Sequence, residues 1–186
     1  MPDINSAHIL IVATHGFEQS ELEVPRDKLR AAGATVHVAT PDGKPIRGWD
    51  QSDWGREVEA DRAFEDVTPD DYDAIVLPGG QINPDLLRVN ETAMTLIRGF
   101  LEGGRVVAAI CHAPWLLIEA DAVQGREVTS FKSIRRDVEN AGGRWSDVPV
   151  ACDRGIVTSR NPGDLDAFVA KIVEEVREGR HARKAA

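Results

Sequence analysis

A cysteine and a histidine stand side by side in the segment Ala109-Ile110-Cys111-His112-Ala113, between two apolar runs. A thiol is a strong nucleophile once deprotonated, and an imidazole exchanges protons near neutral pH. Small residues flank the pair, as in a nucleophile elbow, where the chain turns sharply from a strand into a helix. A free cysteine is more often just a small buried hydrophobe. The neighbouring histidine and the strand-to-helix position favour Cys111 as a nucleophile and His112 as its proton carrier.

Backbone N–H groups are expected around this corner. Cys111 would stand at the beginning of the next helix, where unpaired N–H groups and the helix dipole stabilise an anion, so we predict a lowered thiol pKa. The N–H of His112 points the same way and would stabilise an oxyanion. Gly79 and Gly80, in the segment LPGG, can bring further N–H groups close because glycine has no Cβ.

Four short apolar runs predict the strands that carry these loops, at residues 8–14, 35–40, 74–77 and 106–110. Amphipathic segments lie between and after them, and residues 148–160 read as two further strands around a turn. Strands that alternate with helices predict an α/β three-layer sandwich, a doubly wound and mostly parallel sheet with helices on both faces. We expect one domain over residues 1–186, with 179–186 as a frayed tail.

Three loops follow the carboxyl ends of predicted parallel strands, where open sheets bind their ligands. They read HGFEQSE, PGGQINPD and CHAPW. Their convergence would bring Glu18 and Asp85 within reach of Cys111 and His112. Trp49 and Trp54 are assigned to a polar loop.

Composition excludes several classes of protein. The net charge of −9 argues against a nucleic-acid binder. The N-terminus does not read as a secretory signal, and no run approaches the roughly 20 apolar residues of a membrane span. We therefore expect a cytoplasmic protein whose two cysteines, Cys111 and Cys152, are free thiols. No cysteine and histidine cluster has zinc spacing, so we expect neither a metal site nor a cofactor.

Five collinear motifs give the sequence a family resemblance. They are GFEQSEL, LPGG followed by NPDLLR, AICHAPWLL, VTSFKSI followed by DVENAGG, and VTSRNPGDLDAF. Together they resemble the PfpI family of intracellular cysteine peptidases, in the superfamily of the parkinsonism-linked stress protein, with a class I glutamine-amidotransferase-like fold. The resemblance implies peptide hydrolysis, removal of early glycation adducts, glyoxal hydration, chaperone-like action or protection against oxidative stress.

The resemblance also implies roles for individual residues. Cys111 matches the family nucleophile and His112 the histidine after it, while Glu18 matches the buried acid that hydrogen-bonds to the sulfur. Asp85 matches the acid that reaches the histidine of a neighbouring subunit, although another acid remains open for that role. Gly79 or Gly80, with the His112 N–H, matches the oxyanion hole. Family members are homodimers, or hexamers built as trimers of dimers.

Two alternatives to a hydrolase of peptides or small carbonyl compounds stay open. A reactive cysteine also suits a redox sensor that is oxidised under stress. A chaperone would need an exposed apolar patch. Glutamine amidotransfer is disfavoured, because that reaction needs a histidine and a glutamate late in the chain and only His181 follows His112.

Overall fold

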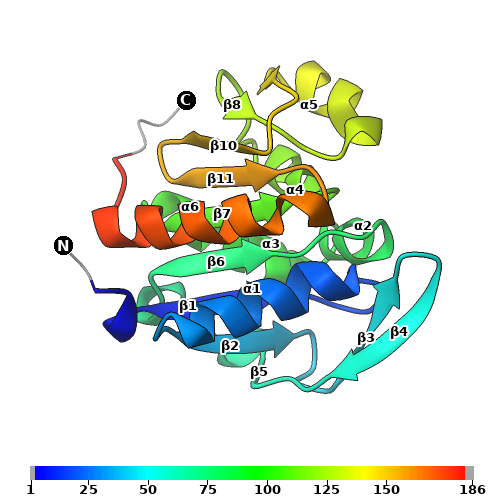
Figure 1. Cartoon of the computed structure of the whole chain (residues 1–186), viewed down its shortest axis with the longest axis vertical. Coiled ribbons are helices and arrows are strands. Elements are labelled where there is room, and N and C mark those ends of the chain that lie inside the picture. The colour runs from blue at the N-terminus through cyan, green and yellow to red at the C-terminus, as the bar shows by residue number, and fades with distance from the viewer. Residues whose placement is uncertain (1–2, 183–186) are drawn as a thin grey trace.

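The computed structural model describes residues 3–182, and residues 1–2 and 183–186 lie outside the description. Its centre is a seven-stranded sheet in the order β10-β11-β7-β6-β1-β2-β5 (Figure 1). Every neighbouring pair is parallel except β10 and β11. The strands are β1 (His8–Val12), β2 (Thr35–Thr40), β5 (Arg62–Ala63), β6 (Ala74–Leu77), β7 (Val106–Ile110), β10 (Val150–Asp153) and β11 (Ile156–Ser159).

Both faces of the sheet are covered, and the alternation of side chains along β1 shows how. Ile9 and Ile11 enter one apolar cluster together with Leu22 of α1 (Gln19–Ala31) and Phe168 of α6 (Leu165–Glu178). Leu10 and Val12 enter the other cluster, which includes residues of α3 (Glu91–Glu102) and α4 (Pro114–Glu119). Successive strand residues point to opposite faces, so apolar runs without polar residues suit a sheet buried on both sides. The predicted three-layer α/β sandwich is confirmed.

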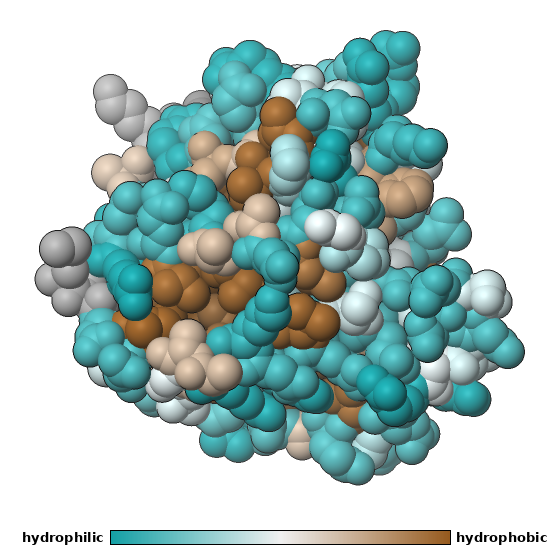
Figure 2. All heavy atoms as spheres, in the orientation of Figure 1, coloured by the Kyte–Doolittle hydropathy of each residue, from teal (hydrophilic) through white to brown (hydrophobic). Residues whose placement is uncertain are grey.

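The helices α1 and α6 lie side by side on one face, and apolar side chains are visible in the band between them (Figures 1 and 2). Partly buried Val24 and Val173 pack there against the core. Proline is best tolerated in the first turn of a helix, but α1 begins at Gln19, so Pro25 lies inside it. The longer α1 also brings Glu21 into its first turn and onto its buried side.

Residues 46–58 form a β-hairpin, which corrects the prediction of a polar loop around Trp49 and Trp54. The hairpin consists of β3 (Ile46–Asp50) and β4 (Asp53–Val58), and the two indole rings meet edge to face at 5.6 Å across it. Cross-strand aromatic pairs of this kind stabilise antiparallel strands. A backbone bridge joins Glu18 to Trp49, so the hairpin is attached beside the loop that follows β1.

Smaller elements complete the chain. Asn90 caps α3, its side chain accepting a hydrogen bond from the N–H of Ala93. The strands β8 (Glu127–Val128) and β9 (Arg144–Trp145) are short and form a separate two-stranded sheet. The remaining elements are α2 (Ile82–Leu87), α5 (Arg135–Asn140) and 3-10 turns at Ile4–Ser6, Phe64–Asp66, Pro69–Asp71, Lys132–Ile134 and Pro162–Asp164.

The end of the chain is more ordered than the sequence suggests. The N–H of His181 donates to the carbonyl of Gly104 at 2.7 Å, so the predicted frayed tail does not hold at this residue. Residues 183–186, the end of the predicted tail, lie outside the described residues. Within residues 3–182, no helix is both long and apolar enough to cross a membrane.

Candidate active site

Cys111 occupies a strained corner directly after β7. Its φ of +65° lies in the left-handed region that residues with a Cβ seldom adopt. The surrounding structure holds this conformation, because its N–H donates to Ser159 and its carbonyl accepts from the N–H of Phe131. Strain of this kind concentrates at functional sites. The predicted sharp corner between β7 and α4 is therefore present, with the cysteine at its apex.

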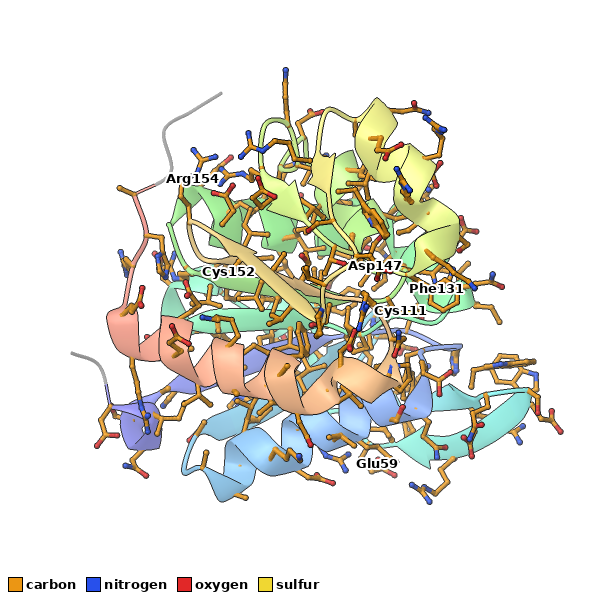
Figure 3. The ribbon with its side chains drawn as sticks, turned by 45° about the horizontal axis from the view of Figure 1, so that its top comes forward. Glu59, Cys111, Phe131, Asp147, Cys152 and Arg154 are labelled. Carbon is orange, nitrogen blue, oxygen red and sulfur yellow. The ribbon has the colours of Figure 1, made fainter. Side chains whose placement is uncertain are left out.

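The sulfur faces the imidazole of the next residue. Cys111 Sγ lies 3.1 Å from His112 Nδ1, and on the other side of the ring Nε2 lies 3.0 Å from the hydroxyl of Ser133. Phe131 stacks on the imidazole with ring centroids 4.8 Å apart, and Trp115 meets it edge-on at 5.3 Å. Figure 3 labels Cys111 and Phe131 at the same end of the sheet. Both ring nitrogens therefore have partners, and two aromatic side chains restrain the ring.

The acid beside the sulfur is Glu21, which corrects the assignment of that role to Glu18. The Glu21 carboxyl interacts with the Cys111 thiol, and its Oε2 accepts the N–H of Gly79 at 2.8 Å. Glu18 lies three residues earlier, directly before α1, and lines the pocket instead. The sequence did hold a signal for Glu21: it precedes Pro25 by four residues and Leu29 by eight, and both lie on the buried face.

Burial sets the protonation of this group of residues. Removal from water raises the pKa of Glu21 to about 8, so its carboxyl is protonated and neutral at pH 7. Burial likewise lowers the pKa of His112, which leaves a neutral imidazole able to accept a proton. Burial also raises the pKa of Glu18, and this effect is larger than the opposite effect of the hydrogen bond that Glu18 accepts from the N–H of Gln51.

The prediction of a lowered thiol pKa at Cys111 is wrong for this arrangement. Burial raises that pKa, and Glu21 adds to the effect when it is ionised, while the N–H groups of Gly80 and His112 act in the opposite direction. The helix after the corner, α4, has only six residues and begins at Pro114, so its dipole is weak and distant. A thiol paired with a neutral imidazole is the resting state that these contacts favour.

The two glycines differ in what their N–H groups do. Gly80 and His112 both direct backbone N–H groups at the Cys111 sulfur. The N–H of Gly79 is already bound by Glu21, so it does not face the sulfur as a free donor. A Cβ on Gly79 would lie 2.5 Å from Glu21 Oε2 and 2.6 Å from the Cβ of Cys111. Gly79 therefore permits the close approach of α1 to the corner, and Gly80 supplies the donor.

Asn83, which sequence reasoning did not single out, holds the glycine loop in place. It is fully buried, accepts the N–H of Thr14 at 2.7 Å and donates to the carbonyl of Pro78 at 2.9 Å. Asp85, two residues on, is exposed on α2 and does not line the pocket within this chain. In the segment NPD, the asparagine positions the loop, and the aspartate points outward.

A cavity of about 500 Å³ opens onto Cys111 and His112. Trp49 and Gln51 of the hairpin form one wall, and Ile82 of α2 and Phe131 form another. Glu18 is the one carboxyl among the lining residues. The buried sulfur is thus reached through a confined pocket with mostly apolar and amide walls.

Comparison with known proteins identifies the family. Residues 7–175 match the profile of the DJ-1/PfpI family. This chain belongs to the DJ-1/PfpI family. Deglycase TK1284 of Thermococcus kodakarensis is 41% identical over 169 residues, which cover 91% of this chain and 99% of that protein. General stress protein 18 of Bacillus subtilis is 39% identical over 162 residues, covering 86% and 92%.

A solved DJ-1/PfpI structure shows the same architecture. The crystal structure of DJ-1beta from Drosophila melanogaster matches with a TM-score of 0.83 at 30% identity, over 93% of this chain and 95% of that one. The family and the fold predicted from the sequence are confirmed, and the names of the relatives support the predicted class of enzyme.

Proposed function

We propose that this DJ-1/PfpI protein is a cysteine-dependent hydrolase that acts on small carbonyl adducts, as a deglycase does, with Cys111 as the nucleophile. The observation that carries the proposal is the strained Cys111, whose sulfur lies 3.1 Å from His112 Nδ1 at the base of a cavity of about 500 Å³. A pocket of this size suits a modified side chain or a small aldehyde. The deglycase name of TK1284 supports the same choice.

The first chemical step follows from the resting protonation states. The neutral His112 accepts the thiol proton at Nδ1 as Cys111 Sγ attacks the carbonyl carbon. The S–C bond forms, the π electrons of the C=O bond move onto oxygen, and the N–H groups of Gly80 and His112 are the donors nearest to stabilise that charge. The imidazolium then returns its proton to the oxygen or to a leaving nitrogen.

Ser133 and Glu21 support this chemistry without touching the substrate. Ser133 Oγ accepts a hydrogen bond from His112 Nε2–H, which fixes the tautomer whose Nδ1 is free to accept the thiol proton. Protonated Glu21 would donate to the thiolate and lower the cost of forming it. Glu18 lines the pocket. Gly79 has no Cβ, which allows α1 to lie close to the corner at Cys111.

Peptide hydrolysis is the second candidate, since the same nucleophile, base and donors serve amide bonds. An extended peptide would have to enter beside Trp49 and Gln51 of the hairpin, which line the pocket. The deciding experiment compares wild type with Cys111→Ala and Cys111→Ser on glyoxal-type carbonyls, early glycation adducts and fluorogenic peptides. We expect turnover of the carbonyl substrates, lost in both variants. Full activity of Cys111→Ala would overturn the proposal.

Association with further copies of the chain belongs to the same proposal. Ile82, Leu86 and Val89 are large apolar side chains exposed on and beside α2, and they flank Asp85. A homodimer, or a hexamer of three dimers, that buries this face would shelter those side chains and bring Asp85 to a neighbouring subunit. There it would have to replace Ser133 at His112 Nε2, because that nitrogen is already bound. Sedimentation of wild type and Leu86→Glu tests the contact.

A redox sensor is the alternative that keeps Cys111 and discards turnover. Cys152 does not supply a resolving thiol in this fold. The register pairs Cys152 with Val157 and Val157 with Ala108, so Cys152 lies two strands across and three residues back from Cys111. With strand spacings of about 4.8 Å and rises of about 3.3 Å, the Cα separation is about 14 Å, and disulfides need about 4.4–6.8 Å. A sensor that works through a disulfide would therefore have to use an external thiol, whereas oxidation of Cys111 to a sulfinic acid needs no second thiol.

We place the protein in a reducing cytoplasm, as part of the same proposal. Both cysteines are free thiols, and free thiols persist in reducing compartments. Fractionation of the producing cell with an antibody to the chain tests this location.

A further inference from the structure

A second group of reactive side chains lies away from the catalytic pocket, at the end of α6. Glu175, Glu178 and His181 each offer one ligand atom, and these atoms all lie within 4.8 Å of one another. Cys152 of β10 hydrogen-bonds to the Glu175 carboxylate from the neighbouring strand. Figure 3 labels Cys152 on β10, apart from Cys111. The group thus combines one imidazole and two carboxylates, and the Cys152 sulfur lies beside one of those carboxylates.

The geometry of the group suits a small tetrahedral ion. His181 Nε2 lies 3.3 Å from Glu175 Oε2. Two ligands of a tetrahedral ion with bonds of about 2.0 Å are separated by about 3.3 Å. His181 Nε2 is fully buried and has no hydrogen-bond partner of good geometry. The backbone hydrogen bond from His181 to Gly104 fixes the residue that carries this nitrogen.

The electrostatics of the site favour a cation. The side chain of Glu175 is only 8% exposed, and a buried carboxylate needs a compensating positive charge. Glu175 and Glu178 both lie in the last turn of α6, where the helix dipole is negative and repels carboxylates. Lys171, one turn earlier, pairs with Glu174 on the exposed side. A protonated His181 would compensate one charge, whereas a divalent ion would compensate both.

We propose that Glu175, Glu178 and His181, with Cys152 as the fourth donor, bind a divalent transition-metal ion, for which Zn²⁺ is the best match to the mixed donor set. Thiolate and imidazole select zinc over magnesium or calcium, which prefer oxygen ligands alone. Coordination by Cys152 releases its thiol proton to solvent. The ion would join the C-terminal segment to α6 and β10. The sequence predicts no metal site, because two glutamates on a helix and a histidine beyond it do not form a cysteine and histidine pattern.

The test uses the full-length Cys111→Ala protein, because Cys111 and His112 could bind a thiophilic ion themselves. The metal-free protein is titrated with Co²⁺, which reports tetrahedral coordination by its visible bands and thiolate ligation by charge-transfer absorption in the near ultraviolet. We expect one Co²⁺ per chain, displaced by Zn²⁺, and a rise in Tm as Zn²⁺ is added. Cys152→Ser should remove the charge-transfer band.

Variants of the other ligands complete the test. His181→Ala and Glu178→Gln should each weaken binding by about tenfold or more, and Glu178 is exposed, so its variant is expected to fold. Glu174→Gln, the adjacent exposed carboxylate, is the matched control and should bind as the Cys111→Ala parent does. Absence of stoichiometric binding in the Cys111→Ala protein, or unchanged affinity in His181→Ala and Glu178→Gln, would overturn the proposal. The group would then be an ion pair between Glu175 and a protonated His181.

Discussion

The hydroxyl of Ser133 lies 3.0 Å from His112 Nε2, on the side of the imidazole opposite the Cys111 sulfur. A nucleophile, a base and an orienting group are therefore present within one chain. The orienting group is a neutral hydroxyl on an exposed residue and not a buried carboxylate. A hydroxyl stabilises the imidazolium less than a carboxylate does, so this triad suits a base that starts neutral.

Replacing Ser133 with alanine removes the partner of Nε2 and leaves the thiol contact in place. A hydrogen bond with a net worth of about 0.5–1.5 kcal/mol predicts a fall in kcat of between about two- and tenfold, with KM little changed. Ser133→Thr should restore most of the rate. Lys132→Ala, the exposed neighbour, is the control. A pH–rate profile checks the mechanism: loss of activity on acidification should shift in Ser133→Ala, because His112 must be neutral to act.

Glu21→Gln should change how stability depends on pH. The folded-state pKa of Glu21 is raised to about 8 from an ordinary value of 4.5, so the folded protein holds this proton when the unfolded chain has lost it. Its contribution to stability is complete below about pH 4.5 and is lost as the pH rises to about 8, by up to about 1.4 kcal/mol per pH unit. Glutamine has no proton to lose.

The measurement is the free energy of unfolding by urea at several pH values between about 5 and about 9, a range that includes the pKa of Glu21 in the folded protein. We expect the decline in wild type to be shallower in Glu21→Gln. Glu23→Gln, on the same helix, should retain the wild-type slope. Parallel curves for wild type and Glu21→Gln would show that Glu21 is ionised in the folded protein at neutral pH.

Asn83→Ala should destabilise the fold and slow catalysis together. The variant leaves the buried N–H of Thr14 without an acceptor, at a cost of about 1–3 kcal/mol in the free energy of unfolding. It also releases the loop that carries Gly79 and Gly80, so kcat should fall. Asp85→Asn, on the same helix but exposed, is the control for stability and should stay within about 0.5 kcal/mol of wild type. Equal stability of both variants would contradict the role given to Asn83.

Gly79→Ala should fail for steric reasons. The added Cβ would meet Glu21 Oε2 at 2.5 Å and the Cys111 Cβ at 2.6 Å, so α1 or the corner must shift. We expect a loss of about 1–3 kcal/mol in stability and of most activity. Gly125→Ala is the control that has backbone strain without crowding. Its φ is +67°, but an added Cβ would meet nothing within 4 Å. Activity should survive in Gly125→Ala, and retention of activity in Gly79→Ala would contradict the close approach.

The sequence by itself determined the order of strands and helices, the three layers and the corner at Cys111. Each of these depends on the local pattern of apolar residues. The run Val106–Ile110 is an example: it has no polar residue, so it predicts a strand that is covered on both faces. The neighbouring His112 is fixed for the same reason: adjacency in the chain guarantees adjacency at the corner.

Only the tertiary structure decided which side chains complete the site. Glu21 and Gly79 are 58 residues apart, and their contact depends on how far α1 extends and how it rotates against the sheet. A shift of three residues along a helix is nearly a full turn, so Glu18 and Glu21 look alike in the sequence, while packing buries Glu21 completely and Glu18 only in part. Ser133 likewise reaches His112 through a loop whose path no local pattern encodes. Periodicity is a property of neighbouring residues, whereas these contacts are properties of packed elements.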